Sequence, residues 1–499
     1  MRREKGGKLC FKRGAVIWWA VAIGVLLGLM ALCFWGRSCS KLNGSEPLSV
    51  YRIDASYDGE RGVTAEMNFG YVNGGEGSVE RLYFHLYPAA FREGAQFRAI
   101  HEANRAEAFP EGESFGGIEI ESVSGELVGS YEVEGQDEDI LCVELSRAVE
   151  PTERTEIFIK FSLEIPNALH RFGASEGRVN LGNWYPVLCE SEGGTVDTSP
   201  YYEVGDPFYS AVADYEVSFS APSGFDVITS GEEVVEKGEN CVRVTAKGAK
   251  MRDFAVVIGK FDSVEREAHG VKIRYFFVSD DDSAARVQAA ADAIETFSEL
   301  FGAYPYPSLD VVESGLFYGG MEYPALVMVS RNQSDSLKTE AVIHETAHQW
   351  WYAVVGNNQV ASAWLDEGLA EYSTTLFYEK NPSYGVTRQA RIADAAGSYM
   401  VYLSSTADSS TAMNRRLPDF PTPTDYAFLS YVKGALMLDS LRSAVGDQKF
   451  FDSLRAYYEE NAFSIASPDH FIGAFERFAG VGVGSFIRCW IEGREVECQ

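Results

Sequence analysis

Hydrophobic and polar residues alternate in short segments through the first half of the chain. Gly, Asn, Asp and Pro bound these segments, which lie at residues 64–73, 81–88, 155–165, 214–222 and 241–247. Alternation with a period of two, interrupted by turn-forming residues, is typical of antiparallel strands with one buried face. We therefore predict an all-β sandwich domain over residues 48–264.

The period changes to that of a helix after residue 264. A helix is predicted from Ser283 to just before Gly302, because apolar residues recur at helical spacing at Val287, Ala290, Ala291, Ile294, Phe297 and Leu300. Helical patterns continue to the end of the chain, so we expect an α+β domain over residues 265–499. No linker rich in Pro or Ser separates the two domains, and they are expected to pack directly on each other.

The first 36 residues have a different pattern, a basic segment followed by an uncharged one. Residues 14–36 would span about 35 Å as a helix, which predicts a transmembrane helix. Six Lys/Arg side chains precede it and only two follow closely, so residues 1–13 are expected to be a cytoplasmic tail and the rest of the chain to lie outside the cell. The alternatives are a cleaved signal peptide, whose apolar region is shorter, and a buried core helix.

Composition and charge exclude some functions. The chain has 499 residues and a formal net charge of -30, of which residues 42–499 carry -37 against a basic N-terminus. A body this acidic is not expected to bind nucleic acid. The eight cysteines are scattered without CxxC spacing, which argues against a thiolate zinc site, although Cys489 and Cys498 are close enough in sequence to pair.

The motif HETAH begins at His344 and ends at His348, within a helix predicted over about residues 336–356. Spacing of four residues places both imidazoles on one helix face, where they can bind one zinc ion, and Glu345 can reach a water molecule on that ion. Glu367 follows after eighteen intervening residues, on a second predicted helix. Two histidines, a glutamate and an open fourth position are typical of catalytic zinc, so we expect one Zn2+ per chain.

Glu371 lies one helical turn after Glu367 on the same predicted face. A carboxylate in that position can accept a hydrogen bond from the second ring nitrogen of a zinc-binding histidine and so orient the ring. We therefore name Glu371 as a candidate orienting residue.

Three ordered elements resemble the M1 metallo-aminopeptidases, a gluzincin family. HETAHQW followed by WLDEGLA resembles the zinc-binding pattern, GGMEYP at residues 319–324 is similar to the GxMEN exopeptidase motif, and YVKGALML at residues 431–438 is similar to the YxKGA segment. The resemblance covers nearly all of residues 48–499 and implies a β-sandwich followed by a thermolysin-like catalytic domain. The chain stops soon after these elements, so we expect a short form without the large C-terminal helical domain of many relatives.

The resemblance also implies roles for individual residues. Glu345 is the expected base, which takes a proton from water and passes it to the leaving amine. Tyr431 would donate a hydrogen bond to the developing oxyanion. Glu322 would pair with the α-ammonium group of the substrate, in a substrate-binding loop that also contains Gly319, Gly320 and Met321.

The sequence departs from the family pattern at two positions. Tyr323 stands where GxMEN has Asn, and Asp366 stands where the family's NEGFA segment has Asn, so neither Asn role carries over. The family also uses a residue of the sandwich domain to help hold the amine. The corresponding segment reads RVNLGNWYPVLCE, in which we name Glu190 as the candidate.

These observations predict a membrane-anchored zinc aminopeptidase that removes N-terminal residues from peptides at the outer face of the membrane. Its expected partners are peptides with a free N-terminus and the membrane itself. The alternatives are a related gluzincin with another substrate, such as a glycyl-aminopeptidase-like enzyme or an epoxide hydrolase, and a non-catalytic anchored scaffold that binds peptides. The scaffold is disfavoured because all four residues of the zinc chemistry are present, namely His344, Glu345, His348 and Glu367.

Overall fold

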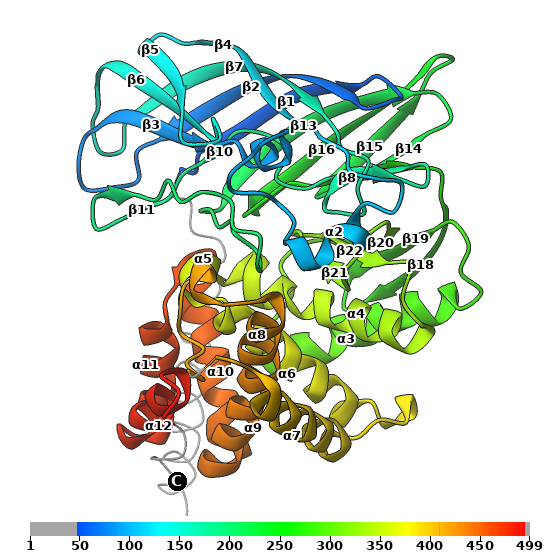
Figure 1. Ribbon diagram of the computed structural model, residues 1–499, viewed down its shortest axis with the longest axis vertical. Coiled ribbons are helices and arrows are strands. Elements are labelled where there is room, and N and C mark those ends of the chain that lie inside the picture. Colours follow the sequence, from blue (N-terminus) through cyan, green and yellow to red (C-terminus); the bar gives the residue numbers. More distant parts are fainter. Residues whose placement is uncertain (1–46, 409, 495–499) are drawn as a thin grey trace, which may run out of the picture. The chain divides into compact units, whose positions relative to one another are not determined.

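The computed structural model describes residues 47–408 and 410–494 (Figure 1). From Pro47 onward the chain forms a single compact unit. The predicted tail and transmembrane helix, residues 1–13 and 14–36, lie outside the described residues, and within these residues no helix is both long and apolar enough to span a membrane. Cys489 is disulfide-bonded, and its expected partner Cys498 lies outside the described residues.

Seven strands form the largest sheet of the N-terminal part, in the order β15-β16-β13-β1-β2-β7-β4. β1 pairs with β13 in parallel and with β2 in antiparallel register. Every second side chain of β2 and β7 is buried, as the alternating pattern predicts. The strands are β1 (Val50–Tyr57), β2 (Gly62–Val72), β4 (Gly117–Ser124), β7 (Arg154–Glu164), β13 (Ala213–Pro222), β15 (Glu232–Lys237) and β16 (Cys241–Met251).

A second sheet, β10-β3-β6-β5, packs against the first. Phe69 of β2 meets Phe84 of β3 edge to face, with ring centroids 5.4 Å apart, and both side chains are fully buried. This packing of two layers agrees with the β-rich N-terminal domain that the sequence predicts. The strands of this sheet are β3 (Val79–His85), β5 (Val128–Glu134), β6 (Ile140–Val149) and β10 (Val187–Leu188).

A third sheet of the N-terminal part has the order β14-β17-β9-β8, and a short ladder joins β11 to β12. One-turn helical segments lie between β3 and β4. The elements are η1 (Tyr87–Phe91), η2 (Glu102–Asn104), α2 (Arg105–Ala108), β8 (Phe172–Ser175), β9 (Arg178–Leu181), β11 (Ser191–Glu192), β12 (Thr195–Val196), β14 (Asp226–Thr229) and β17 (Val256–Gly259).

The C-terminal part begins with a mixed sheet in the order β18-β19-β20-β22-β21. Its first strand starts at Asp262, so the chain changes from one sheet system to the next between Gly259 and Asp262, just before the predicted boundary. Helix α3 packs on β18 and β19, and α4 packs on β22. The elements are β18 (Asp262–Ala268), β19 (Val271–Phe277), α3 (Ser283–Phe301), β20 (Ser308–Ser314), β21 (Gly320–Met321), β22 (Leu326–Ser330) and α4 (Asp335–Ala347).

The remaining chain is helical and gathers in the lower part of Figure 1. Two short strands, β23 and β24, pair in parallel within it. The elements are η3 (Gln349–Val354), β23 (Gly356–Asn357), α5 (Gln359–Ser362), α6 (Trp364–Lys380), η4 (Pro382–Tyr384), α7 (Arg388–Ser405), η5 (Leu417–Asp419), α8 (Pro423–Ala427), η6 (Phe428–Val432), α9 (Lys433–Val445), α10 (Asp447–Asn461), β24 (Ile465–Ala466), α11 (Pro468–Ala479) and α12 (Gly482–Ile491).

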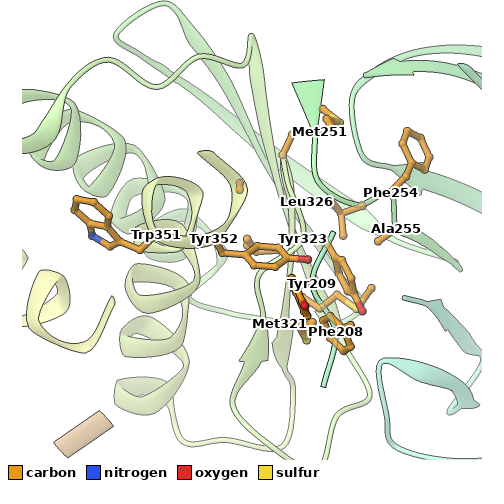
Figure 2. Close-up of a cluster of buried hydrophobic side chains, with 14 of the residues drawn as sticks. Phe208, Tyr209, Met251, Phe254, Ala255, Met321, Tyr323, Leu326, Trp351 and Tyr352 are labelled. Atoms are coloured by element: carbon orange, nitrogen blue, oxygen red, sulfur yellow. The ribbon is translucent and has the colours of Figure 1, made fainter. Parts of the chain in front are cut away.

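The N-terminal and C-terminal parts share one hydrophobic core. Figure 2 shows Phe208 and Phe254 of the first part in the same buried cluster as Met321 and Tyr352 of the second. Arg252 adds buried hydrogen bonds across the junction, because its guanidinium donates to carbonyl oxygens that include those of Tyr352 and Ser464. The two parts therefore pack directly on each other, as the missing linker predicts.

Candidate metal centre and active site

The HExxH motif lies at the C-terminal end of α4. His344 and His348 are buried, with their Nε2 atoms 3.2 Å apart. The helix does not continue regularly to residue 356 as predicted, because the backbone is non-helical at Trp351 and Tyr352. This turn places the carbonyl oxygen of Trp351 at 3.0 Å from Nδ1 of His348. Since a carbonyl oxygen only accepts, Nδ1 carries the proton and Nε2 keeps a lone pair for a metal.

Helix α6 brings Glu367 to the same point. Its Oε2 lies 3.4 Å from Nε2 of His344 and 3.2 Å from Nε2 of His348. Ligands about 2.0–2.1 Å from a tetrahedral zinc ion are about 3.3–3.4 Å from one another, so these three atoms have the mutual spacing of zinc ligands. Within the described residues, Oε2 is buried without a hydrogen-bond partner, as expected of an oxygen that binds a metal. The predicted ligands therefore fit a zinc ion.

Glu371 lies on the same face of α6 as Glu367, behind the metal ligands. Its Oε2 is 3.4 Å from Nδ1 of His344, and its Oε1 accepts a hydrogen bond of 2.7 Å from Arg391 of α7. Arg391 thus holds the carboxylate in place while the carboxylate faces the imidazole. This position is the one that the predicted orienting role requires.

The electrostatics of the site favour a positive charge between the three ligands. Burial opposes a charge on His344, but the nearby carboxylates of Glu367 and Glu371 outweigh burial and raise its pKa to about 10. Burial also opposes ionisation of Glu367, and the two histidines overcome it and lower the pKa of Glu367. A bound metal ion would supply this positive charge in place of protons. For Glu345, burial raises the pKa to about 7, which suits a group that accepts and returns a proton.

A cavity of about 350 Å³ opens over the metal ligands. It brings together nine of the predicted site residues, namely His344, Glu345, His348, Glu367, Glu371, Gly319, Gly320, Glu322 and Tyr431. Met321 does not line it, because its side chain is 1% exposed and lies in the hydrophobic cluster of Figure 2. Side chains alternate along a strand, so Met321 of β21 faces the core while its neighbours face the cavity. Its assignment as a substrate-binding residue is corrected accordingly.

Gly320 packs directly against the predicted catalytic base. A Cβ atom at this position would lie 2.4 Å from Oε1 of Glu345, which is closer than non-bonded atoms can approach. Only glycine lets the GGMEYP loop run past the Glu345 carboxylate without displacing it. Glycine is therefore required at position 320 because a larger residue would displace the carboxylate of Glu345.

Two side chains hold the loop that carries Glu322. Gln349 donates from Nε2 to the carbonyl oxygen of Tyr323 at 3.1 Å and accepts from the backbone nitrogen of Ala325 at 2.8 Å. Tyr323, which replaces the family's Asn, is fully buried, and its hydroxyl donates to Oδ1 of Asn183 at 2.9 Å. The tyrosine therefore anchors the loop to the N-terminal part of the molecule.

Asp366, which replaces the second family Asn, is 1% exposed beside Glu367. Its two carboxylate oxygens accept hydrogen bonds from Nδ2 of Asn357 at 2.9 Å and from Nε2 of Gln359 at 2.7 Å. Burial and then the charge of Glu367 raise the pKa of Asp366 to about 7. The same Gln359 nitrogen lies 3.3 Å from Oε1 of Glu322. The aspartate is thus connected to the substrate-binding carboxylate through one amide group.

Asp206 is an acidic residue of the N-terminal part that the sequence analysis missed. It lines the cavity, is 7% exposed, and forms an ion pair with Arg171. After burial, its charge is the largest influence that raises the pKa of Glu322, so the two carboxylates face the same space. Glu190, the predicted candidate, does not line the cavity and instead accepts a hydrogen bond from the backbone nitrogen of Ala211. Asp206 is therefore an acidic residue of the N-terminal part that shares the cavity with Glu322.

Tyr431 lies in η6, a single π-helical turn that leads into α9. Its ring stacks on His344 with centroids 5.7 Å apart, and its hydroxyl donates to Oε1 of Glu367. Tyr426 donates to the same oxygen at 3.3 Å, a contact that no sequence motif predicted. Burial and then the charge of Glu367 raise the pKa of Tyr431, so the phenol remains protonated and able to donate.

A pair of glycines brings α6 and α9 into contact. A Cβ at Gly434 would lie only 2.7 Å from Cα of Gly368. Gly368 follows Glu367 directly, and Gly434 lies three residues after Tyr431, so this contact sets the separation of the metal ligand and the phenol. The glycines of WLDEGLA and YVKGALML are therefore the two sides of one helix crossing.

Comparison with known proteins places this geometry in a family. Residues 286–490 match the Peptidase family M1 domain. Aminopeptidase M1 of Arabidopsis thaliana is 26% identical over 255 residues, which are 47% of this chain and 28% of that protein. Aminopeptidase N of Streptomyces lividans is 21% identical over 300 residues, which are 56% of this chain and 35% of that protein. The chain thus spans about a third of the length of these relatives.

Solved structures show the same fold over almost the whole chain. The M1 zinc metallopeptidase of Deinococcus radiodurans aligns with a TM-score of 0.64 at 17% sequence identity, over 90% of this chain and 94% of that one. A form of that protein bound to a Tyr-Ser-Ala substrate aligns with a TM-score of 0.62. The resemblance seen in the zinc and exopeptidase motifs is confirmed, because residues 286–490, which contain the three metal ligands, match the Peptidase family M1 domain.

Proposed function

We propose that this protein is a zinc-dependent aminopeptidase, which removes the first residue from peptides. The observation that carries the proposal is the position of Glu322, whose carboxylate has an oxygen within 4.8 Å of a ring nitrogen of His348. The α-ammonium nitrogen and the first carbonyl carbon of a peptide are about 2.5 Å apart. A peptide held by its ammonium group at Glu322 therefore presents its first peptide bond, and no later one, to the metal ligands.

The residues of the site supply the steps of peptide hydrolysis. His344, His348 and Glu367 would hold Zn2+, which supplies a Lewis acid for water and for the scissile carbonyl. Glu345 takes a proton from the attacking water and transfers it to the leaving nitrogen as the C–N bond breaks, which yields a free amino acid and a peptide shortened by one residue. Tyr431 donates a hydrogen bond to the oxyanion that develops on the carbonyl.

Two carboxylates of the cavity hold the substrate ammonium group in this proposal. Glu322 comes from the C-terminal part and Asp206 from the N-terminal part, and both face the cavity. Because Arg171 balances the charge of Asp206, the pair can bind one ammonium group without leaving two uncompensated negative charges. The names of the relatives, which are aminopeptidases, support this substrate class, as does the tripeptide bound to the Deinococcus protein.

The proposal is tested by comparing peptides with a free and an acetylated N-terminus. Acetylation removes the ammonium group and leaves Glu322 buried without its partner, which should lower kcat/KM by about a hundredfold. Glu322→Ala should abolish most of this discrimination. Glu203→Ala removes another carboxylate that lines the cavity and should preserve the discrimination between free and acetylated peptides. Internal cleavage of acetylated peptides by the wild type, at rates similar to those of free peptides, would contradict the proposal.

We also propose that the protein acts at the outer face of the cell membrane, anchored by residues 14–36. The support is the uncharged length of this segment and the basic residues 1–13 before it. Protease added to intact cells should digest residues 42–499. If this part survives until the membrane is broken, the proposed orientation is wrong.

A further inference from the structure

We propose that Gln359 is a positioning residue, which holds the carboxylate of Glu322 in place for substrate binding. The inference rests on the proposed aminopeptidase function, because Glu322 is the group that binds the ammonium in that function. Gln359 belongs to the short helix α5, is 1% exposed and does not line the cavity. It therefore has no contact with substrate and acts through Glu322.

One amide nitrogen of Gln359 serves two acidic side chains. Nε2 donates to Oδ2 of Asp366 at 2.7 Å and to Oε1 of Glu322 at 3.3 Å. An amide nitrogen carries two hydrogens, so it can make both bonds at once. Asp366 is itself fixed on its other oxygen by Asn357. The fixed carboxylate of Asp366 therefore holds the Gln359 amide in place, and the amide in turn holds the carboxylate of Glu322 at the cavity.

The amide is needed because the two carboxylates are close and buried. Glu322 and Asp366 have oxygen atoms within 4.8 Å of each other, and the side chains are 3% and 1% exposed. Like charges at this distance repel strongly where water is excluded. The two N–H groups of Gln359 lie between them and offset the repulsion. Without these groups, Glu322 would turn away from Asp366 and lose its alignment with the metal ligands.

The orientation of the Gln359 amide supports this role. Its Oε1 atom is buried and has no hydrogen-bond partner among the described residues. An unpaired buried oxygen costs stability, yet the opposite orientation would turn this oxygen toward two carboxylates. The carboxylates therefore determine which end of the amide faces them. Such an arrangement serves the position of Glu322 rather than the stability of the fold.

The test uses Gln359→Met, which keeps the length of the side chain and removes both N–H groups. We expect kcat/KM for free-amine peptides to fall about tenfold or more, and the ratio of rates for free and acetylated peptides to fall with it. Zinc content should stay at one ion per chain. Asn461→Leu is the control for loss of a buried amide, because the Asn461 side chain bonds to the carbonyl oxygen of Tyr457 and not to either carboxylate.

A double-mutant cycle separates positioning from a general structural effect. If Gln359 acts through Glu322, then Gln359→Met should cause no further loss of discrimination in a Glu322→Ala background. Gln359→Glu, which keeps the shape of the side chain and also removes the N–H donors, serves as the second variant if Gln359→Met does not fold. Full discrimination in either folded variant would overturn the inference. Absence of discrimination in the wild type would instead overturn the proposed function.

Discussion

Glu345 and His348 lie within one turn of α4 but have different expected tasks. His348 directs Nε2 at the point where Glu367 and His344 converge, and its other nitrogen is held by Trp351. Glu345 is not part of this group of ligand atoms, although it lines the same cavity. The difference in position predicts a difference between the corresponding variants.

Glu345→Gln should keep about one zinc ion per chain while the rate of hydrolysis falls by orders of magnitude, because the amide cannot accept the proton of water. His348→Ala should lose the metal, because two ligands remain where three are needed. Metal analysis after dialysis, together with a rate assay on an aminoacyl reporter substrate, checks both. Equal loss of zinc in the two variants would show that Glu345 is a ligand and not the base.

The Tyr431 hydroxyl has two candidate hydrogen-bond acceptors. One is Oε1 of Glu367, and the other is the oxyanion that develops on the substrate. If the oxyanion is its catalytic partner, Tyr431→Phe should lower kcat by about a hundredfold with little change of KM, because the oxyanion exists only in the transition state. Zinc content should not change. A variant that loses zinc together with activity would show that Tyr431 acts by holding Glu367 instead.

At the scale of the elements, two of the helices at the site have irregular turns at one end. The backbone after α4 turns out of the helix at Trp351, and η6 makes a single π-helical turn before α9. Single π-helical turns are often found at functional sites. Here the first turn supplies the acceptor for His348 and the second presents Tyr431 to Glu367.

The close crossing of α6 and α9 leads to a prediction about Gly434. Gly434→Ala would add a Cβ 2.7 Å from Cα of Gly368, so the helices must separate and move Tyr431 away from Glu367. We expect a destabilisation of about 1–3 kcal/mol and a loss of activity larger than the loss of folded protein explains. Thermal unfolding and kcat measured on the same samples check this.

Gly397→Ala is the matched control for this variant. Gly397 lies inside α7, and among the described residues nothing beyond its chain neighbours and its own helix backbone lies within 4 Å of the Cβ that it would gain. Alanine is the better helix former by about 1 kcal/mol, so this variant should be slightly more stable than the wild type and fully active. Similar losses in the two variants would show that the glycine contact does not set the geometry of the site.

At the scale of the whole molecule, stability should fall in acid because histidines are buried in the N-terminal part. His85 is 6% exposed and stacks on Tyr87 with ring centroids 4.8 Å apart. Burial lowers its pKa to about 4, although Asp197 partly opposes this effect. In the unfolded chain, His85 binds a proton near pH 6.5. Its contribution to stability is therefore fully present above this pH and is lost as the pH falls toward 4.

His85→Phe keeps the ring contact with Tyr87 and removes the proton-binding group. The decrease in free energy of unfolding between pH 7 and pH 4.5 should become smaller by about 2 kcal/mol. Urea unfolding at the two pH values, compared with the wild type, measures the difference. His269→Asn changes an exposed histidine and should leave the decrease unchanged. An unchanged decrease in His85→Phe would mean that His85 is not buried in the neutral form.

Local patterns in the sequence predicted the elements and the metal ligands well. Helix α3 covers Ser283–Phe301, the segment that the apolar spacing predicted, and the strands of the N-terminal part alternate as expected. His344 and His348 meet because four residues are about one helical turn, which is geometry within a single element. Glu367 could be added because its separation from His348 matches a known pattern. These features depend on the spacing of residues along the chain, which can be read directly from the sequence.

Only the tertiary structure decided which other side chains reach the site. Asp206 lies on a loop between β12 and β13, and Gln359 lies on a helix of four residues, so neither has a periodic pattern to mark it. Met321 sits in the predicted loop, yet the pleat of β21 turns it into the core. Asp206 reaches the cavity because the two parts pack together, a contact between residues far apart in the chain. Sequence spacing therefore determined the metal-binding chemistry, whereas the packing of separate segments determined which groups hold the substrate and keep Glu322 in position.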